Sequence, residues 1–262
     1  MKSQSFWLHS IFGMNDETEM DYGSSIARNI LIGKNVAAHM ADDEMLKVFL
    51  GPLLAPDHLK HIKEVFDFYS ISFGERDDPG QWDTYGDKHR GVAIGLAPAL
   101  FANINARDLA PEDKVYVAKV LYGPLACAER HHAAIDVTFD LLEIARQRGL
   151  VTANAAGLAF TKAMATHMAV PIIWNSITTK SLDWEHEREL RMLAVNDLTN
   201  PHLPIHHRDD GRSYVIVPMP LLETGMVAEI VVGANAHVDA EAEVEHLLRS
   251  VGMHAVPLIR RA

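Results

Sequence analysis

The sequence predicts an α+β fold, in which a mixed, mostly antiparallel central sheet, whole or split, is surrounded by helices in a single domain over residues 1–262. Three observations predict this class. Of the 262 residues, 48% are hydrophobic and 23% are charged, which is an ordinary globular composition. Short runs rich in β-branched and aromatic residues are interspersed with two long helical patterns. The elements do not follow regular β–α–β order, so a doubly wound or barrel fold is a poor match.

The first half of the chain is expected to mix strands with helices. Asn15 or Asp16 should cap the first helix through its side-chain oxygen, with Glu17 and Glu19 in the first turn. Pro56 favours the start of a later short helix, because a missing N–H costs nothing there. The predicted strands cover residues 6–12, 65–73, 91–96 and 114–122, and the predicted helical stretches cover residues 42–50, 56–65 and 81–88.

Two helices and a β-rich last third are expected in the second half. A long helix should cover residues 124–148, where Gly149 is a stop signal. His132 falls near the apolar stripe of this helix and is expected in the core. A nearly uncharged helix over residues 153–168 is expected to be buried. Strands should follow at residues 170–177, 188–194, 213–217, 227–232 and 254–259, and a final helix, capped by Asp239, should run to residue 250.

Composition excludes several classes of protein. Cys127 is the only cysteine, which excludes an internal disulfide and every multi-cysteine metal site. The formal net charge of −11 argues against binding to a nucleic-acid backbone. No run approaches the ~18 apolar residues of a membrane helix, and the first residues lack a signal-peptide core, so a cytoplasmic protein is expected.

A group of histidines and aspartates near residue 205 is expected to be an exposed loop. Imidazole and carboxylate can bind zinc or iron, but the group lacks the spacing of a helical metal-binding motif. We therefore expect no metal there. The group comprises His202, His206, His207, Asp209 and Asp210.

The strongest local pattern is a charged segment that ends at Arg191. If the segment is a strand, Glu187, Glu189 and Arg191 share one face, with the two glutamates about 6–7 Å apart. One carboxylate would then bind a sugar hydroxyl and the other would stabilise positive charge, while Arg191 would keep a carboxylate ionised. The alternative is a helix with a solvated charged face, on which Glu187 pairs with Arg191.

A second pattern combines hydroxyl groups with aromatic rings. Ser70 and Ser72 lie on a predicted strand, and Trp82 and Tyr85 follow in a short helical turn. Aromatic rings near small polar groups can form a stacking platform for a planar ligand. The alternative is that Trp82 and Tyr85, three residues apart, only anchor that turn onto the core.

Together these segments resemble the family catalogued as domain of unknown function 2971. Its members share an Asn-Asp-x-x-Glu element, a serine-bearing strand, a Trp-x-x-Tyr turn and a Gly-Val-x-Ile-Gly strand. A Lys-x-x-x-aromatic-x-x-Glu-x-Glu-x-Arg segment and a strand that ends in glycine follow. Many relatives begin with a His-Tyr-Thr strand and a helix, which this chain is expected to lack. The matching residues here are 15–19, 69–73, 82–85, 91–96, 229–233, and Lys180, Trp184, Glu187, Glu189 and Arg191.

The layout of this family is similar to an ADP-ribosyltransferase fold, in which a late Glu-x-Glu strand supplies the catalytic acid. The resemblance implies that Glu189 is catalytic, with Glu187 as its partner and Arg191 holding the pair. NAD is then the implied substrate, because a fixed carboxylate stabilises the positive charge that develops on the ribose as the glycosidic bond breaks. The remaining residues assigned to ligand binding are Ser70, Ser72, Trp82, Tyr85, Asn15, Asp16, Glu19 and Lys180.

Two other interpretations remain open. The chain could be a non-catalytic binding or regulatory domain, such as a sensor or effector in a bacterial defence system, with the charged segment as a structural ion-pair network. It could also form a homo-oligomer in which a neighbouring subunit supplies the missing strand at an exposed sheet edge. A cleft shared by Glu187, Glu189, Trp82 and Tyr85 would favour the enzyme.

Overall fold

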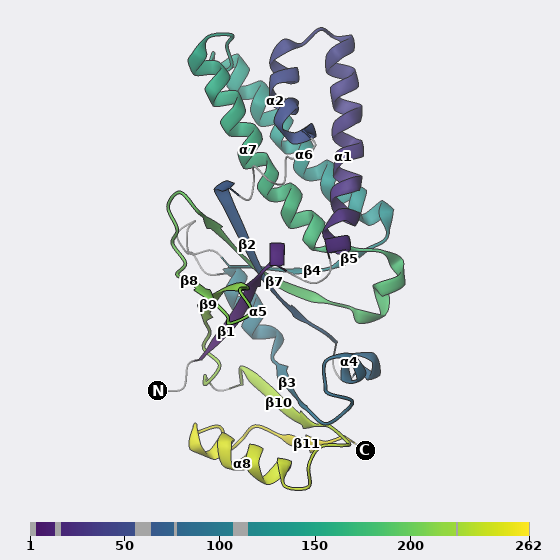
Figure 1. Ribbon diagram of the computed structural model, residues 1–262, viewed down its shortest axis with the longest axis vertical. Helices are drawn as coiled ribbons and strands as arrows, with labels where there is room; N and C mark the ends of the chain where they lie inside the picture. Colours follow the sequence, from purple (N-terminus) through teal and green to yellow (C-terminus); the bar gives the residue numbers. More distant parts are fainter. Residues whose placement is uncertain are drawn as a thin grey trace.

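The computed structural model describes residues 4–13, 17–55, 64–75, 78–106, 115–223 and 225–261. Its elements form three tiers (Figure 1). Four long or medium helices stand at one end, a six-stranded sheet lies in the middle, and a three-stranded sheet with one helix lies at the other end. The predicted α+β class, with a mostly antiparallel sheet and surrounding helices, is confirmed.

The six-stranded sheet has the order β4-β7-β2-β1-β9-β8, and every neighbouring pair is antiparallel. β1 lies inside this sheet, between β2 and β9, so the first strand of the chain is held on both edges. Apolar residues on the two faces of β2 and β7 enter different cores, because successive side chains point to opposite faces. The strands are β1 Ser5–Ser10, β2 Phe66–Phe73, β4 Val115–Lys119, β7 Leu190–Asp197, β8 Ile205–His207 and β9 Ser213–Pro218.

The helical tier covers one face of this sheet. Its members are α1 Glu17–Met40, α2 Glu44–Leu54, α6 Pro124–Gln147 and α7 Ala155–Ile177. Asp43 and Asn154 cap the starts of α2 and α7 through their side chains, and Gly149 follows α6 with a φ of 72°, as its predicted role as a stop requires. The helices bury a common apolar core with β2 and β7.

One predicted strand is wrong, because residues 170–177 continue α7. The run contains Val170 and three isoleucines, and such β-branched residues favour a strand. A short buried apolar run does not distinguish strand from helix, however, and α1, α2 and α6 all pack against α7. By length and composition alone α7 could cross a membrane, and core helices of bundles pass the same test.

The buried histidine of α6 is His131, and the predicted residue, His132, is exposed. Successive residues on a helix are about 100° apart, so an error of one position moves a side chain from the edge of the stripe into the core. Burial and the neighbouring positive charge of Arg130 lower the pKa of His131 to about 4.

The smaller sheets and short helices complete the fold. β3 Val92–Leu96, β10 Val227–Val232 and β11 Leu258–Arg260 form the three-stranded sheet, in the order β11-β10-β3. β5 Leu121–Tyr122 pairs with β6 Thr179–Lys180, next to the six-stranded sheet. The helices are η1 Ile11–Gly13, α4 Pro79–Thr84, α5 Pro98–Ala106, η3 Leu182–Glu187 and α8 Ala240–Ser250.

Two further expectations need correction. Asp239 precedes α8 but makes no side-chain capping bond. The expected loop near residue 205 contains β8, which adds the outer strand to the sheet.

Most of the helix predicted over residues 56–65 lies outside the described residues. Among the side chains that the structure describes, no group of three or more His, Cys, Asp or Glu residues is placed to hold a metal ion.

Candidate functional site

Four charged side chains from three elements meet beneath the helical tier. Lys180 Nζ of β6 lies 2.6 Å from Glu187 Oε2 and 2.9 Å from Glu189 Oε2. Arg191 of β7 donates two hydrogen bonds to the same Glu189, from Nε to Oε1 at 2.7 Å and from Nη2 to Oε2 at 3.0 Å. We call these four residues the charged cluster. The sequence motif that contains them therefore folds into a single network.

Each of the two interpretations of this motif describes part of it. Leu182–Glu187 is a 3-10 helix, Arg188 adopts a left-handed conformation with a φ of 42°, and the strand begins at Leu190. Glu187 thus ends a helical turn, and its placement on the strand face of Glu189 is wrong. The glutamates are brought together by Lys180, which reaches both of them from the neighbouring sheet.

The charged cluster is buried, with each of its four residues at most 9% exposed. Burial alone would raise the pKa of Glu189, but hydrogen bonds and charge from Arg191, together with Ser72 and Lys180, hold it below its ordinary value. The Glu189 backbone N–H donates to the Tyr122 hydroxyl, and Arg191 also donates to the Ile177 carbonyl. Two carboxylates and two cations thus form a neutral network that ties β7 to the end of α7.

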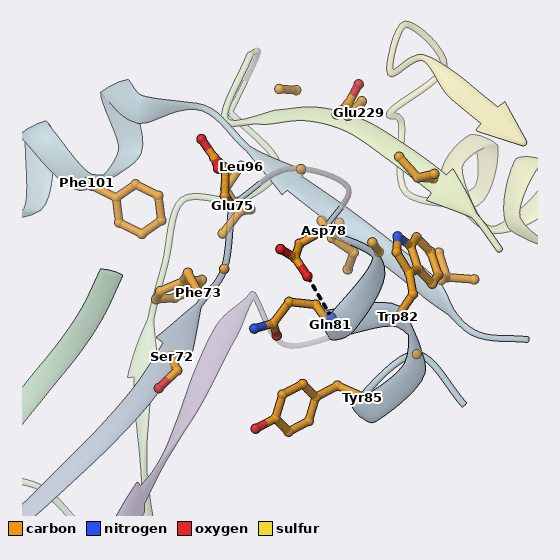
Figure 2. A pocket seen from close by; sticks show the side chains of 18 residues that line it. Ser72, Phe73, Glu75, Asp78, Gln81, Trp82, Tyr85, Leu96, Phe101 and Glu229 are labelled. Carbon is orange, nitrogen blue, oxygen red and sulfur yellow. Dashed lines mark hydrogen bonds between the residues drawn. The ribbon is translucent and has the colours of Figure 1, made fainter. Parts of the chain in front are cut away.

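A cavity of about 610 Å³, whose lining is drawn in Figure 2, adjoins this network through Ser72. Its size is typical of sites for small ligands. The end of β2 and helix α4 form two of its walls, and β3, β10 and Phe101 of α5 form the others. Figure 2 shows the Tyr85 and Gln81 side chains extending from α4 towards the end of β2. The cavity combines four aromatic residues with three carboxylates, and these are Phe73, Trp82, Tyr85, Phe101, Glu75, Asp78 and Glu229.

Trp82 and Tyr85 both line the cavity but differ in role. Trp82 is only 5% exposed, stacks on His89 at 6.0 Å between ring centroids, and carries the Arg261 guanidinium 5.6 Å from its ring. This agrees with the anchor interpretation for Trp82. Tyr85 is 76% exposed, which leaves its ring accessible to a ligand.

The loop after α4 holds the Trp82 wall in place. Asp87, Lys88 and His89 have φ values of 50°, 53° and 65°, an unusual run of left-handed conformations for residues other than glycine. Asn235, which follows β10, donates its side-chain amide to the Lys88 carbonyl and its backbone N–H to the His89 carbonyl. The close approach requires Gly233, because a Cβ there would lie 2.1 Å from the His89 carbonyl oxygen.

Ser72 is the point where the charged cluster and the cavity meet. Its side chain lines the cavity and hydrogen-bonds to Glu189. None of the four cluster residues is among the described residues that line the cavity. A cleft shared by Glu187, Glu189, Trp82 and Tyr85, which would favour the enzyme, is therefore not formed by these described residues, and the charged cluster and the cavity are two adjoining features.

The other predicted site residues are scattered. Ser70 is 2% exposed and lies deeper along β2, away from the cavity lining. Asn15 and Asp16 lie outside the described residues, and Glu19 lies in α1. Sequence reasoning missed six cavity residues, and the only signal was that Phe73 directly follows Ser72; the six are Phe73, Glu75, Asp78, Gln81, Phe101 and Glu229.

The fold and site define an α+β protein with an open aromatic and acidic cavity against a buried ion-pair network. The family described as Protein of unknown function (DUF2971) matches this chain over residues 81–192. This match confirms the family resemblance, over the part of the chain that carries α4, β3 and the charged cluster. A search of curated proteins and a search of solved structures find no match for the chain.

Proposed function

We propose that this chain is a binding protein whose cavity accepts a planar, positively charged group. The observation that carries the proposal is the lining itself. Aromatic rings attract cations through their faces, and Tyr85 presents an exposed ring beside Phe73 and Phe101. Of the described residues that line the cavity, three are carboxylates and none is lysine or arginine.

The three cavity carboxylates differ in their contacts within the protein. Glu75 pairs with Arg188 at 3.0 Å on the surface, and Asp78 accepts the backbone N–H of Gln81 at 3.0 Å. Glu229 extends over Gly95, where an added Cβ would lie 2.6 Å from its Cγ. The nicotinamide ring of NAD is one planar cation of suitable chemistry, which keeps NAD as a candidate ligand.

The proposal predicts that Tyr85→Ala weakens the binding of 1-methylnicotinamide about fivefold, which is the value of one exposed cation–π contact. Titration calorimetry measures the dissociation constant. Tyr116→Ala is the matched control, because Tyr116 is 44% exposed and contacts Trp174, away from the cavity. Nicotinate, a planar anion of similar size, should bind more weakly. Equal affinity for the two ligands, or no effect of Tyr85→Ala, contradicts the proposal.

A second candidate function is cleavage of the N-glycosidic bond of NAD, which is favoured by the hydrogen bond from Ser72 to Glu189. Water would attack the ribose C1′ and lose a proton to solvent, and nicotinamide would leave with the electron pair of the broken bond. Glu189 would stabilise the positive charge on the ribose. The ion pairs of Glu189 with Arg191 and Lys180 make this the weaker candidate, because its carboxylate is already bound.

Cleavage predicts that the wild-type chain releases nicotinamide from NAD and that Glu189→Gln does not. Chromatography of the reaction mixture, with and without cell extract to supply an acceptor, measures the release. Glu185→Gln is the control, because Glu185 lies on the exposed side of η3. Absence of release by the wild type leaves binding as the function of the cavity, and equal release by Glu189→Gln excludes Glu189 as the catalytic residue.

A further inference from the structure

The outer edge of β3 has backbone groups that no described strand uses. β3 is the last strand of the order β11-β10-β3. The Gly91 carbonyl accepts the Gly233 N–H, and the Ala97 N–H donates to the Met226 carbonyl, so the odd-numbered residues of this segment face β10. Because alternate residues point their polar groups to opposite edges, the N–H and C=O groups of Val92 and Ile94 point away from β10.

The side chains of β3 do nothing to protect this edge. Proteins usually shield an outer strand with proline or with a charged residue, most often lysine. β3 reads Val-Ala-Ile-Gly-Leu, and Val92 and Ile94 are 45% and 62% exposed. The outer strands β4, β8 and β11, by contrast, carry a lysine, two histidines and an arginine.

The same edge opens into the cavity. All five residues of β3 line it, and helix α4 and the end of β2 face them across the space (Figure 2). An extended chain beside β3 would therefore have a strand edge on one side and the Tyr85 ring on the other. Gly95 leaves the cavity face of β3 clear of a side chain where Glu229 crosses it.

We propose that the edge of β3 binds an extended, arginine-bearing peptide segment of another protein as an added fourth strand. Backbone hydrogen bonds to Val92 and Ile94 give this mode its affinity, and alternate side chains give it specificity. A guanidinium is a planar cation that stacks on aromatic faces and pairs with carboxylates. The proposal rests on the proposed function, because the arginine side chain is the planar cation that enters the cavity.

The probe is the hexapeptide Thr-Arg-Val-Arg-Val-Thr, labelled with fluorescein at its N-terminus and amidated at its C-terminus, and its binding to the full chain is measured by fluorescence anisotropy. Two isomers carry N-methyl groups on alternate amides, one set on each edge of the peptide strand. We expect one isomer to lose about tenfold in affinity, through the loss of two backbone hydrogen bonds, and the other to keep its affinity. A twin with citrulline for arginine should bind about fivefold more weakly.

Protein variants test the same edge from the other side. Ile94→Pro removes the outward N–H without touching the bonds to β10, and Ile94→Thr keeps that N–H and serves as its control. We expect only the proline variant to weaken the peptide. In the wild type, the amide protons of Val92 and Ile94 should gain protection from hydrogen exchange when the peptide binds.

The outcomes separate the two proposals. Equal affinity of the two N-methyl isomers, or no binding of the peptide, overturns pairing at β3. If 1-methylnicotinamide still binds in that case, the cavity keeps its proposed function. If neither the peptide nor 1-methylnicotinamide binds, both proposals fall.

Discussion

Replacing Arg191 by methionine is expected to lower the free energy of unfolding by about 3–5 kcal/mol, the range for breaking one side of a buried ion pair. Arg191 is 3% exposed and holds both oxygens of Glu189, which is 6% exposed. Without it, two buried carboxylates share Lys180, and the Ile177 carbonyl loses a donor. Urea denaturation followed by circular dichroism measures the change.

Arg188→Met is the matched control, because Arg188 lies three residues before Arg191 and its side chain is on the surface. Arg188 pairs with Glu75, and both side chains are more than half exposed, so its loss should cost less than about 1 kcal/mol. In the double variant Glu189→Gln, Arg191→Met, one buried carboxylate, Glu187, pairs with one lysine, Lys180. The double variant should therefore recover much of the free energy of unfolding that Arg191→Met loses. An effect of Arg191→Met no larger than that of Arg188→Met would show that the charged cluster is not a structural network.

Between pH 6.5 and pH 4, the native state is expected to lose about 3 kcal/mol of stability through His131. Burial, with the positive charge of Arg130, lowers the pKa of this side chain from 6.5 to about 4. As the pH falls through this window, the unfolded chain binds a proton at His131 and the folded chain does not. Protonation therefore favours unfolding.

Urea midpoints at pH 7 and pH 4.5 measure this loss. His131→Leu should reduce the difference between the two midpoints, and His132→Leu, at the exposed neighbour, should leave it unchanged. Glu189 acts in the same direction at lower pH, because its folded pKa lies below its ordinary value and its stabilising effect disappears only as the pH falls through that value. An identical pH dependence in His131→Leu would exclude His131 as the source.

Most of the fold could be predicted because local pattern and tertiary packing agree. The strands β2, β3, β9 and β10 lie within a residue or two of their predicted ranges, since each is a short apolar run bounded by turn residues. The end of α7 could not be predicted. Its isoleucine-rich run is compatible with a strand or a helix, and the helix forms because α1, α2 and α6 pack against it.

The site shows the same division. The charged motif was visible because its residues lie within a dozen positions, and the structure brings all of its predicted charges together. The cavity was only half visible. Glu229 reaches it from β10 and Phe101 from α5, and no local spacing relates these residues to Tyr85. Burial of the glutamates was also hidden, since it depends on α7 and β6.

The position of β1 inside the sheet has a consequence for synthesis on the ribosome. Ser5 pairs with Pro218, more than 200 positions later. At about 5–20 residues per second, β1 leaves the ribosome roughly 10–40 s before its partner on that edge exists. Throughout that interval the edge of β1 that pairs with β9 stays unpaired, so this pairing comes late in cotranslational folding.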